Sequence, residues 1–176
     1  MAENRLASVE WKQTRAPLSL VFAGLIAIGC ASSVHVPQLV WNASASAPIG
    51  LYRLVGNEAH KGDLALIATP PAIRTFAALR GYLPANVPMV KRIVAGNGDV
   101  VCALGNAILV DGRPLVRRLS RDGRHRALPA WHGCRTLTRA DVFLLMTDVA
   151  ESFDGRYFGP TARSAVLGKL VPLWTE

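Results

Sequence analysis

The chain has 176 residues, which is enough for one compact domain and a short appendage. Hydrophobic residues make up 51% of the sequence and charged residues only 18%, a composition that excludes an intrinsically disordered protein. The formal net charge of +8 would suit either a nucleic acid or an anionic membrane surface as a partner.

The first predicted element is an apolar stretch at residues 16–34, in which Cys30 is the only side chain that can ionise. Its 19 residues fall within the range of about 17 to 25 that a bilayer-spanning helix requires. We therefore expect a single transmembrane anchor. A buried core helix, a cleaved signal sequence and lipid attachment at Cys30 are the alternatives.

The charges beside this stretch predict its orientation. Residues 1–15 contain Arg5, Lys12 and Arg15, whereas residues 34–52 contain no Lys or Arg. Because positive charge is retained in the cytoplasm, residues 1–15 are predicted to be cytoplasmic and residues 35–176 to form a domain on the outer face of the membrane, in a periplasm.

The rest of the chain shows mostly short strands. Residues 34–48 are small and polar, and we interpret them as a connector. Seven runs that follow are rich in Val, Ile, Leu or Phe and bounded by turn-forming residues: 51–55, 64–68, 87–95, 100–103, 107–110, 142–146 and 167–173. The pattern predicts a mostly β, antiparallel domain of sandwich or barrel type.

Turn and helix signals refine this prediction. Gly105-Asn106 separates two of the runs as a hairpin turn would, and Asp111-Gly112 closes the second of them. One short helix is expected to start at Pro70-Pro71, with Thr69 as its cap, and to stop at Gly81.

Two of the three cysteines, Cys102 and Cys134, fall in the exported part. An oxidising compartment favours a disulfide between them, and two buried free thiols are the alternative. We expect no cofactor and no metal site, because the chain has no CxxC pair and its four histidines are scattered.

Six arginines lie between these cysteines, at positions Arg113, Arg117, Arg118, Arg121, Arg124 and Arg126. The segment has neither a recognition-helix pattern nor interleaved aromatic residues, so we expect no binding to nucleic acid. On the outer face of a membrane, the arginines are expected to contact anionic lipid head groups or solvent.

Three segments carry residues that could do chemistry. In the first, residues 42–52, Ser44 and Ser46 would share one face of an extended chain, and a flexible linker is the alternative interpretation. In the second, Lys91 and Arg92 interrupt an apolar run, and strand alternation should turn one of them inward.

A buried lysine is disfavoured as a cation, so its pKa falls and its neutral amine can act as a general base. An edge-strand lysine that reaches solvent is the alternative for Lys91. The third segment follows a predicted strand and contains Ser152, which offers a hydroxyl, and Asp154 and Arg156, which could form an ion pair.

In their order and approximate spacing, these segments resemble the motifs of bacterial signal peptidase I, and most closely the TraF-type peptidases of conjugative transfer. The first motif is matched by Asn42, Ser44, Ser46, Pro48, Gly50, Leu51 and Tyr52. The second is matched by Lys91, Arg92, Gly98 and Asp99, and the third by Ser152, Asp154, Arg156 and Gly159. Ala47 after the first motif's serine and the TDVAES start of the third segment depart from the general enzymes and favour the conjugative branch.

The resemblance implies a signal-peptidase-like β domain behind an N-terminal anchor in a bacterial inner membrane. Within it, Ser46 would be the nucleophile and Lys91 the general base. The Ser46 amide and the Ser44 hydroxyl would stabilise the oxyanion, and Ser152 would orient the Lys91 amine. Asp154 and Arg156 would support the loop that carries Ser152.

For the conjugative branch, the resemblance implies a pilin precursor as substrate, cleaved near its C-terminus and in some systems joined into a ring. A signal peptidase acting on other exported preproteins is the first alternative. A membrane-tethered β domain that binds without catalysis is the second. A soluble self-cleaving repressor is disfavoured, because such proteins carry a DNA-binding domain where this chain has an apolar stretch.

Overall fold

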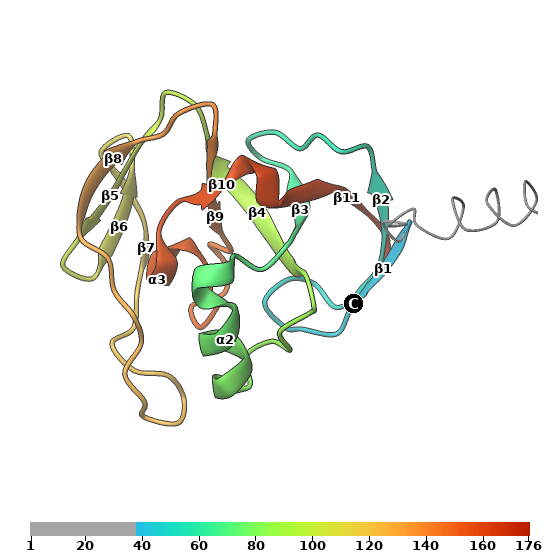
Figure 1. Ribbon diagram of the computed structural model, residues 1–176, viewed down its shortest axis with the longest axis horizontal. Helices are drawn as coiled ribbons and strands as arrows, with labels where there is room; N and C mark the ends of the chain where they lie inside the picture. Colours follow the sequence, from blue (N-terminus) through green and yellow to red (C-terminus); the bar gives the residue numbers. More distant parts are fainter. Residues whose placement is uncertain (1–37) are drawn as a thin grey trace, which may run out of the picture. The chain divides into compact units, whose positions relative to one another are not determined.

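The computed structural model describes residues 38–176 (Figure 1). The predicted cytoplasmic segment and membrane anchor lie outside these residues. Within the described part, no helix combines the length and apolar character needed to cross a bilayer.

Two antiparallel sheets make up most of the described domain, which confirms its mostly β character. The larger sheet has seven strands, in the order β1 (Leu39–Asn42), β2 (Gly50–Val55), β11 (Val166–Thr175), β3 (Leu64–Ile67), β4 (Met89–Ala95), β9 (Asp141–Leu145) and β10 (Thr161–Ala162). The smaller sheet has the order β7 (Arg113–Arg117), β6 (Ala107–Val110), β5 (Val100–Leu104) and β8 (Gly133–Thr136).

Every one of the seven predicted runs forms a strand, but four strands were not predicted. β1 occupies part of the segment that we interpreted as a connector, so that interpretation is wrong for Leu39–Asn42. β7 and β8 are almost wholly exposed, and β10 has only two residues. A strand with no buried face leaves no alternation of apolar residues in the sequence to detect it by.

The helix α2 (Pro71–Arg80) ends as predicted, because Gly81 adopts a left-handed conformation with φ of 71°. The predicted cap is wrong. Pro70 occupies the N-cap position without a side-chain bond, and the Thr69 hydroxyl instead donates to the carbonyl oxygen of Val87 at 3.0 Å. That bond ties the start of the helix to the segment that leads into β4.

The expectation of one short helix is also incomplete. A second short helix, α3 (Gly155–Phe158), follows β9, and the 3₁₀ turn η1 (Arg163–Ala165) precedes β11. Four residues carry too little helical periodicity to stand out in a sequence.

The smaller sheet contains both predicted turns. Gly105-Asn106 joins β5 to β6, and Asp111-Gly112 joins β6 to β7 with φ values of 50° and 75°, as a type I′ hairpin turn requires. The expected disulfide links Cys102 on β5 to Cys134 at the directly opposed position of β8.

Three apolar clusters hold these elements together. One joins the smaller sheet to β9 through residues such as Ile108 and Phe143. The second lies around Ile67 and Ile93 and includes Ile73 of α2. The third, around Tyr52, contains Ala47 from the loop between β1 and β2. The loop that bears Ser46 therefore rests on a packed core.

Candidate active site

The loop between β1 and β2 is organised by one buried amide side chain. Asn42, at the end of β1, is 6% exposed, and its Nδ2 lies 2.9, 3.1 and 3.0 Å from the carbonyl oxygens of Ser44, Ala47 and Pro48. Its Oδ1 accepts a hydrogen bond from the Ser44 amide. These groups have no strand partner, so the Asn42 side chain meets their hydrogen-bonding demand and holds the loop.

Ser44 and Ser46 are close together in this loop, although it forms a turn rather than the extended chain on which we based the prediction. Their Oγ atoms lie 2.8 Å apart, and the Ser46 amide donates to the Ser44 Oγ at 3.2 Å. The Tyr52 hydroxyl holds the other end of the loop by donating to the Pro48 carbonyl at 2.6 Å. A hydroxyl and an amide donor are thus presented side by side.

Strand alternation in β4 turns Lys91 inward and Arg92 outward. The prediction that one of the two faces inward is therefore correct. Lys91 is 3% exposed, whereas Arg92 is exposed and donates to the Gly62 carbonyl. β4 lies between β3 and β9, so its central residues are covered. The alternative of an edge-strand lysine that reaches solvent is therefore wrong.

Burial lowers the pKa of Lys91 from 10.5 to about 8. The nearby carboxylate of Asp154 acts to raise this pKa and the guanidinium of Arg156 acts to lower it, so loss of solvation decides the direction. The amine donates to the Ser152 Oγ at 2.9 Å. At pH 7 about a tenth of such a lysine is neutral, a useful fraction for a general base.

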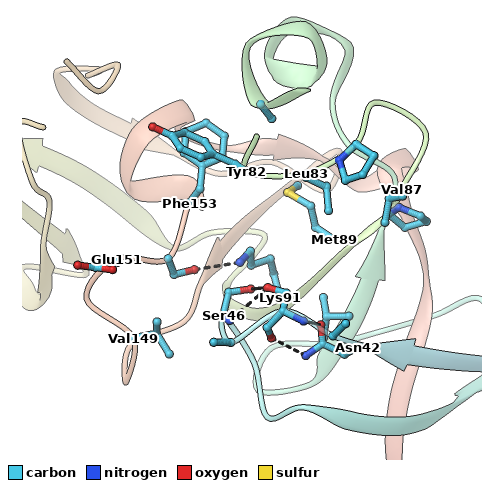
Figure 2. Close-up of a pocket in the computed structure, with 18 of the residues that line it drawn as sticks. Asn42, Ser46, Tyr82, Leu83, Val87, Met89, Lys91, Val149, Glu151 and Phe153 are labelled. Atoms are coloured by element: carbon cyan, nitrogen blue, oxygen red, sulfur yellow. Dashed lines mark hydrogen bonds between the residues drawn. The ribbon is translucent and has the colours of Figure 1, made fainter. Parts of the chain in front are cut away.

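Ser46 and Lys91 line the same cleft, and Figure 2 shows their side chains next to each other in it. In the described part of the chain, the Lys91 amine bonds to Ser152 and the Ser46 hydroxyl bonds to Ser44. Transfer of a proton between Ser46 and Lys91 would therefore need a rotation about side-chain bonds, which a half-buried serine in a loop can make.

The segment behind Ser152 is held by a fully buried ion pair. The Asp154 carboxylate accepts from Arg156 Nε at 2.8 Å and from the Met146 amide at 2.9 Å. Arg156 also donates to the carbonyl oxygens of Met146 and Ala150. The predicted pair thus exists, and it joins the two ends of the loop that carries Ser152.

Sequence reasoning left several parts of this site unidentified. Asn42 was matched to a motif without a role, and an Asn that directly precedes a serine-rich turn was the available signal. Phe153 stacks on Phe76 and Tyr157 with ring centroids 5.8 and 5.7 Å apart, and it lines the cleft beside Ser152. Phe76 lies far from Phe153 in sequence, so no local pattern predicts that contact.

A serine hydroxyl beside an amide donor, with a buried lysine amine in the same cleft of a β domain, is the arrangement of side chains that a serine-lysine peptidase requires. The family model described as signal peptidase, peptidase S26, matches residues 10–174, and the chain belongs to this family. The resemblance inferred from the three motifs is thereby confirmed. The substrates of such a family are peptides.

Curated relatives extend the similarity to conjugation. The chain is 34% identical over 173 residues to the plasmid transfer protein TraF of Escherichia coli, covering 92% of this chain and 96% of the relative. It is 31% identical over 163 residues to the probable conjugal transfer protein TraF of Sinorhizobium fredii, covering 86% and 85%. A crystal structure of a signal peptidase I from Enterococcus faecalis aligns with a TM-score of 0.39 and 18% identity, over 65% of this chain and 97% of that one.

Proposed function

We propose that this protein is a membrane-anchored serine endopeptidase in which Ser46 is the nucleophile and Lys91 the general base. The observation that carries the proposal is the buried Lys91 amine, whose pKa of about 8 leaves it partly neutral in the cleft that also contains Ser46. A lysine at its ordinary pKa would be a cation and could not accept a proton.

The proposed reaction begins when neutral Lys91 takes the proton of the Ser46 hydroxyl, whose oxygen attacks the scissile carbonyl carbon. The Ser46 amide and the Ser44 hydroxyl stabilise the resulting oxyanion. The peptide C–N bond breaks, and the leaving amine takes the proton from Lys91. Lys91 then takes a proton from water, whose oxygen attacks the acyl carbon. The ester C–O bond breaks, and the Ser46 oxygen takes the proton back from Lys91.

Ser152, Asp154 and Arg156 support this chemistry by positioning Lys91. Ser152 orients the Lys91 amine through the 2.9 Å bond. The buried ion pair of Asp154 and Arg156 holds the position of the Ser152 loop. They are positioning residues, and their removal is expected to slow the reaction less than removal of Ser46 or Lys91.

As substrate we propose a conjugative pilin precursor, processed at the outer face of a bacterial inner membrane by a domain attached through residues 16–34. The names of the relatives, which refer to plasmid and conjugal transfer, support this choice over general processing of exported preproteins. Anionic lipid of that membrane is a further proposed contact. The ring-forming variant of the reaction would use an amine of the substrate instead of water.

A serine-reactive acylating probe tests the dyad on the full chain. Labelling is expected to be lost in Ser46→Ala and in Lys91→Arg, because a guanidinium stays protonated. Ser120→Ala is the matched control, since Ser120 is exposed and does not line the cleft. Labelling that survives both active-site changes would leave the non-catalytic binding domain as the better interpretation.

Mass spectrometry of candidate pilin precursors tests the substrate. Cells with the intact protein should contain a shortened pilin, and cells with Ser46→Ala should accumulate the full precursor. Equal masses in the two strains would exclude pilin as the substrate while leaving the probe result untouched.

A further inference from the structure

The cleft extends well beyond Ser46 and Lys91. It encloses about 830 Å³, and one part of it lies between α2, the segment that joins α2 to β4, and the loop at residues 119–128. We call this part the distal lobe and define it by the side chains of Ala77, Tyr82, Leu83, Leu119, Asp122 and Leu128. Figure 2 shows Tyr82 and Leu83 in the part of the cleft away from Ser46.

The loop at residues 119–128 is a folded wall of this lobe. It is a small hairpin, closed by a β-bridge between Arg121 and Ala127 and by a hydrogen bond of 3.0 Å from the Leu128 amide to the Ser120 carbonyl. The Leu119 amide donates to the Tyr157 hydroxyl at 3.2 Å and so joins the base of the hairpin to α3.

The tip of the hairpin is joined to α2. Arg126 Nη2 donates to the Arg80 carbonyl at 3.0 Å, at the last residue of the helix. Its guanidinium also lies over the Tyr82 ring, 5.6 Å from the centroid. Both ends of the hairpin are thus attached to the body of the domain, and the width of the lobe is defined by the fold.

Asp122 is the one acid among the side chains that define the lobe, and its oxygens are already occupied. Oδ1 accepts from the amides of Arg124 and Arg126 at 3.0 and 2.9 Å. Oδ2 accepts from the Tyr82 hydroxyl and from Arg126 Nε. Burial acts to raise the pKa of Asp122, but these hydrogen bonds hold it below its usual range. An acid whose lone pairs are all used offers little to a basic substrate residue.

We propose that the distal lobe is a specificity subsite that binds a large apolar side chain, such as leucine or phenylalanine, at a substrate position away from the scissile bond. The proposal rests on the peptidase function proposed above. Its occupant is the peptide itself, because the lobe is continuous with the cleft that contains Ser46 and Lys91. The remaining lining is apolar, so covering an apolar side chain of the substrate lowers the free energy of the complex.

Quenched alanine-based peptides, in which a single leucine is moved along the chain, test the subsite with the full-length protein in detergent. At one position, leucine should raise kcat/KM about tenfold over the all-alanine peptide, the size expected for a few added carbons in an apolar pocket. Leu119→Ala should reduce this ratio severalfold, mainly through KM.

Gly123→Leu provides a second test that does not remove packing. Gly123 also lines the cleft, and an added Cβ there meets no atom within 4 Å, so the new side chain should narrow the lobe without strain. It should reduce the leucine preference as well. Leu115→Ala is the matched control, because Leu115 is 40% exposed, as Leu119 is at 41%, but does not line the cleft.

The two proposals fail in different ways. If leucine has no effect at any position, if no peptide is cleaved by a protein whose Ser46 is labelled, or if both variants keep the preference of the wild type, the subsite is wrong. If the acylating probe does not label Ser46, the peptidase function is wrong, and the subsite is overturned with it.

Discussion

Lys91 is a basic side chain in a position that disfavours its charge. It is covered by the neighbouring strands, and the opposite effects of Asp154 and Arg156 leave burial as the main influence on its pKa. The same burial should shape both the pH dependence of activity and the stability of the domain, and the two effects can be measured separately.

The activity should follow deprotonation of Lys91. With a pKa of about 8, kcat/KM should rise about tenfold for each pH unit below 7 and level off above about pH 9. A pH series with a quenched peptide substrate checks this. A profile that is flat from pH 6 to pH 9 would mean that another group is the base.

Lys91→Met should stabilise the folded domain while abolishing activity. Below pH 8 the folded protein must keep a proton on a buried amine that the unfolded chain holds in water, which costs up to about 3 kcal/mol for a shift from 10.5 to 8. The lost bond to Ser152 offsets about 1 kcal/mol of the gain.

The free energy of unfolding of Lys91→Met should therefore exceed that of the wild type by about 1 to 3 kcal/mol at pH 7. This difference should disappear as the pH rises from 8 toward 10.5, because the lysine of the unfolded chain then loses its proton as well. Urea unfolding at several pH values measures it. Lys61→Met, at a surface lysine paired with Asp99, should show no such gain. Loss of stability in Lys91→Met at every pH would contradict the burial argument.

Ser152→Ala removes the hydroxyl that orients the Lys91 amine. We expect kcat to fall about tenfold to a hundredfold with KM nearly unchanged, the effect of one hydrogen bond to an ionisable group. Ser152→Thr, which keeps a hydroxyl, should restore part of the rate. Equal rates for the alanine and threonine variants would indicate that Ser152 acts only through packing.

At the scale of elements, the segment from β9 to α3 shows how a short loop keeps its shape without a sheet partner. The buried ion pair of this loop takes the place of backbone hydrogen-bond partners. Asp154 accepts a hydrogen bond from the Met146 amide, and Arg156 donates to the carbonyl oxygens of Met146 and Ala150. Asp154 also caps α3 by accepting from the Arg156 amide. One pair thus ends a loop and starts a helix.

Asp154→Asn should therefore cost about 3 to 5 kcal/mol of folding free energy, since it leaves the buried Arg156 cation without its counter-charge. Asp63→Asn is the control, because its partner Lys169 is 42% exposed and a surface pair contributes at most about 1 kcal/mol. Chemical denaturation compares the two. Similar losses of folding free energy in both variants would show that the buried pair stabilises the domain no more than a surface pair does.

Elements with a buried face were predictable from the sequence, and elements without one were not. β9 is almost wholly apolar and β4 is apolar except at Lys91 and Arg92, and most residues of both strands are buried. β8, in contrast, is exposed throughout and its residues show no pattern. β1 was missed because it is an edge strand of four residues that depends on β2 for its partners.

The candidate site divides in a similar way. Ser46, Lys91 and Ser152 could be proposed because each stands in a motif with a known chemical logic. The bond between Tyr82 and Asp122 joins residues 40 apart, and nothing local in either segment predicts it. In the sequence, Asp122 is the one acid within the arginine-rich residues 113–126, and only the folded hairpin reveals which donors surround it.

For the whole molecule, the cross-strand disulfide closes a long stretch of chain. Cys102 and Cys134 are 32 residues apart, and the bond encloses β6, β7 and the hairpin at residues 119–128. Replacing both cysteines by serine should lower the free energy of unfolding by about 4 kcal/mol, the value that loop-closure entropy gives for a loop of this length.

Thermal unfolding with and without dithiothreitol checks this value. The reductant should lower the Tm of the wild type toward that of the Cys102→Ser/Cys134→Ser variant and should leave the variant unchanged. A reductant-sensitive Tm in the double variant would mean that another part of the chain responds to reduction.

The disulfide also separates two properties of the cleft. Ser46 and Lys91 lie outside the loop it closes, whereas Leu119, Asp122 and Leu128 lie inside it. In a domain exported as proposed, disulfide formation would therefore constrain the wall of the proposed subsite but not the segments that carry Ser46 and Lys91. A molecule that has not yet formed this bond would be reactive before it is selective.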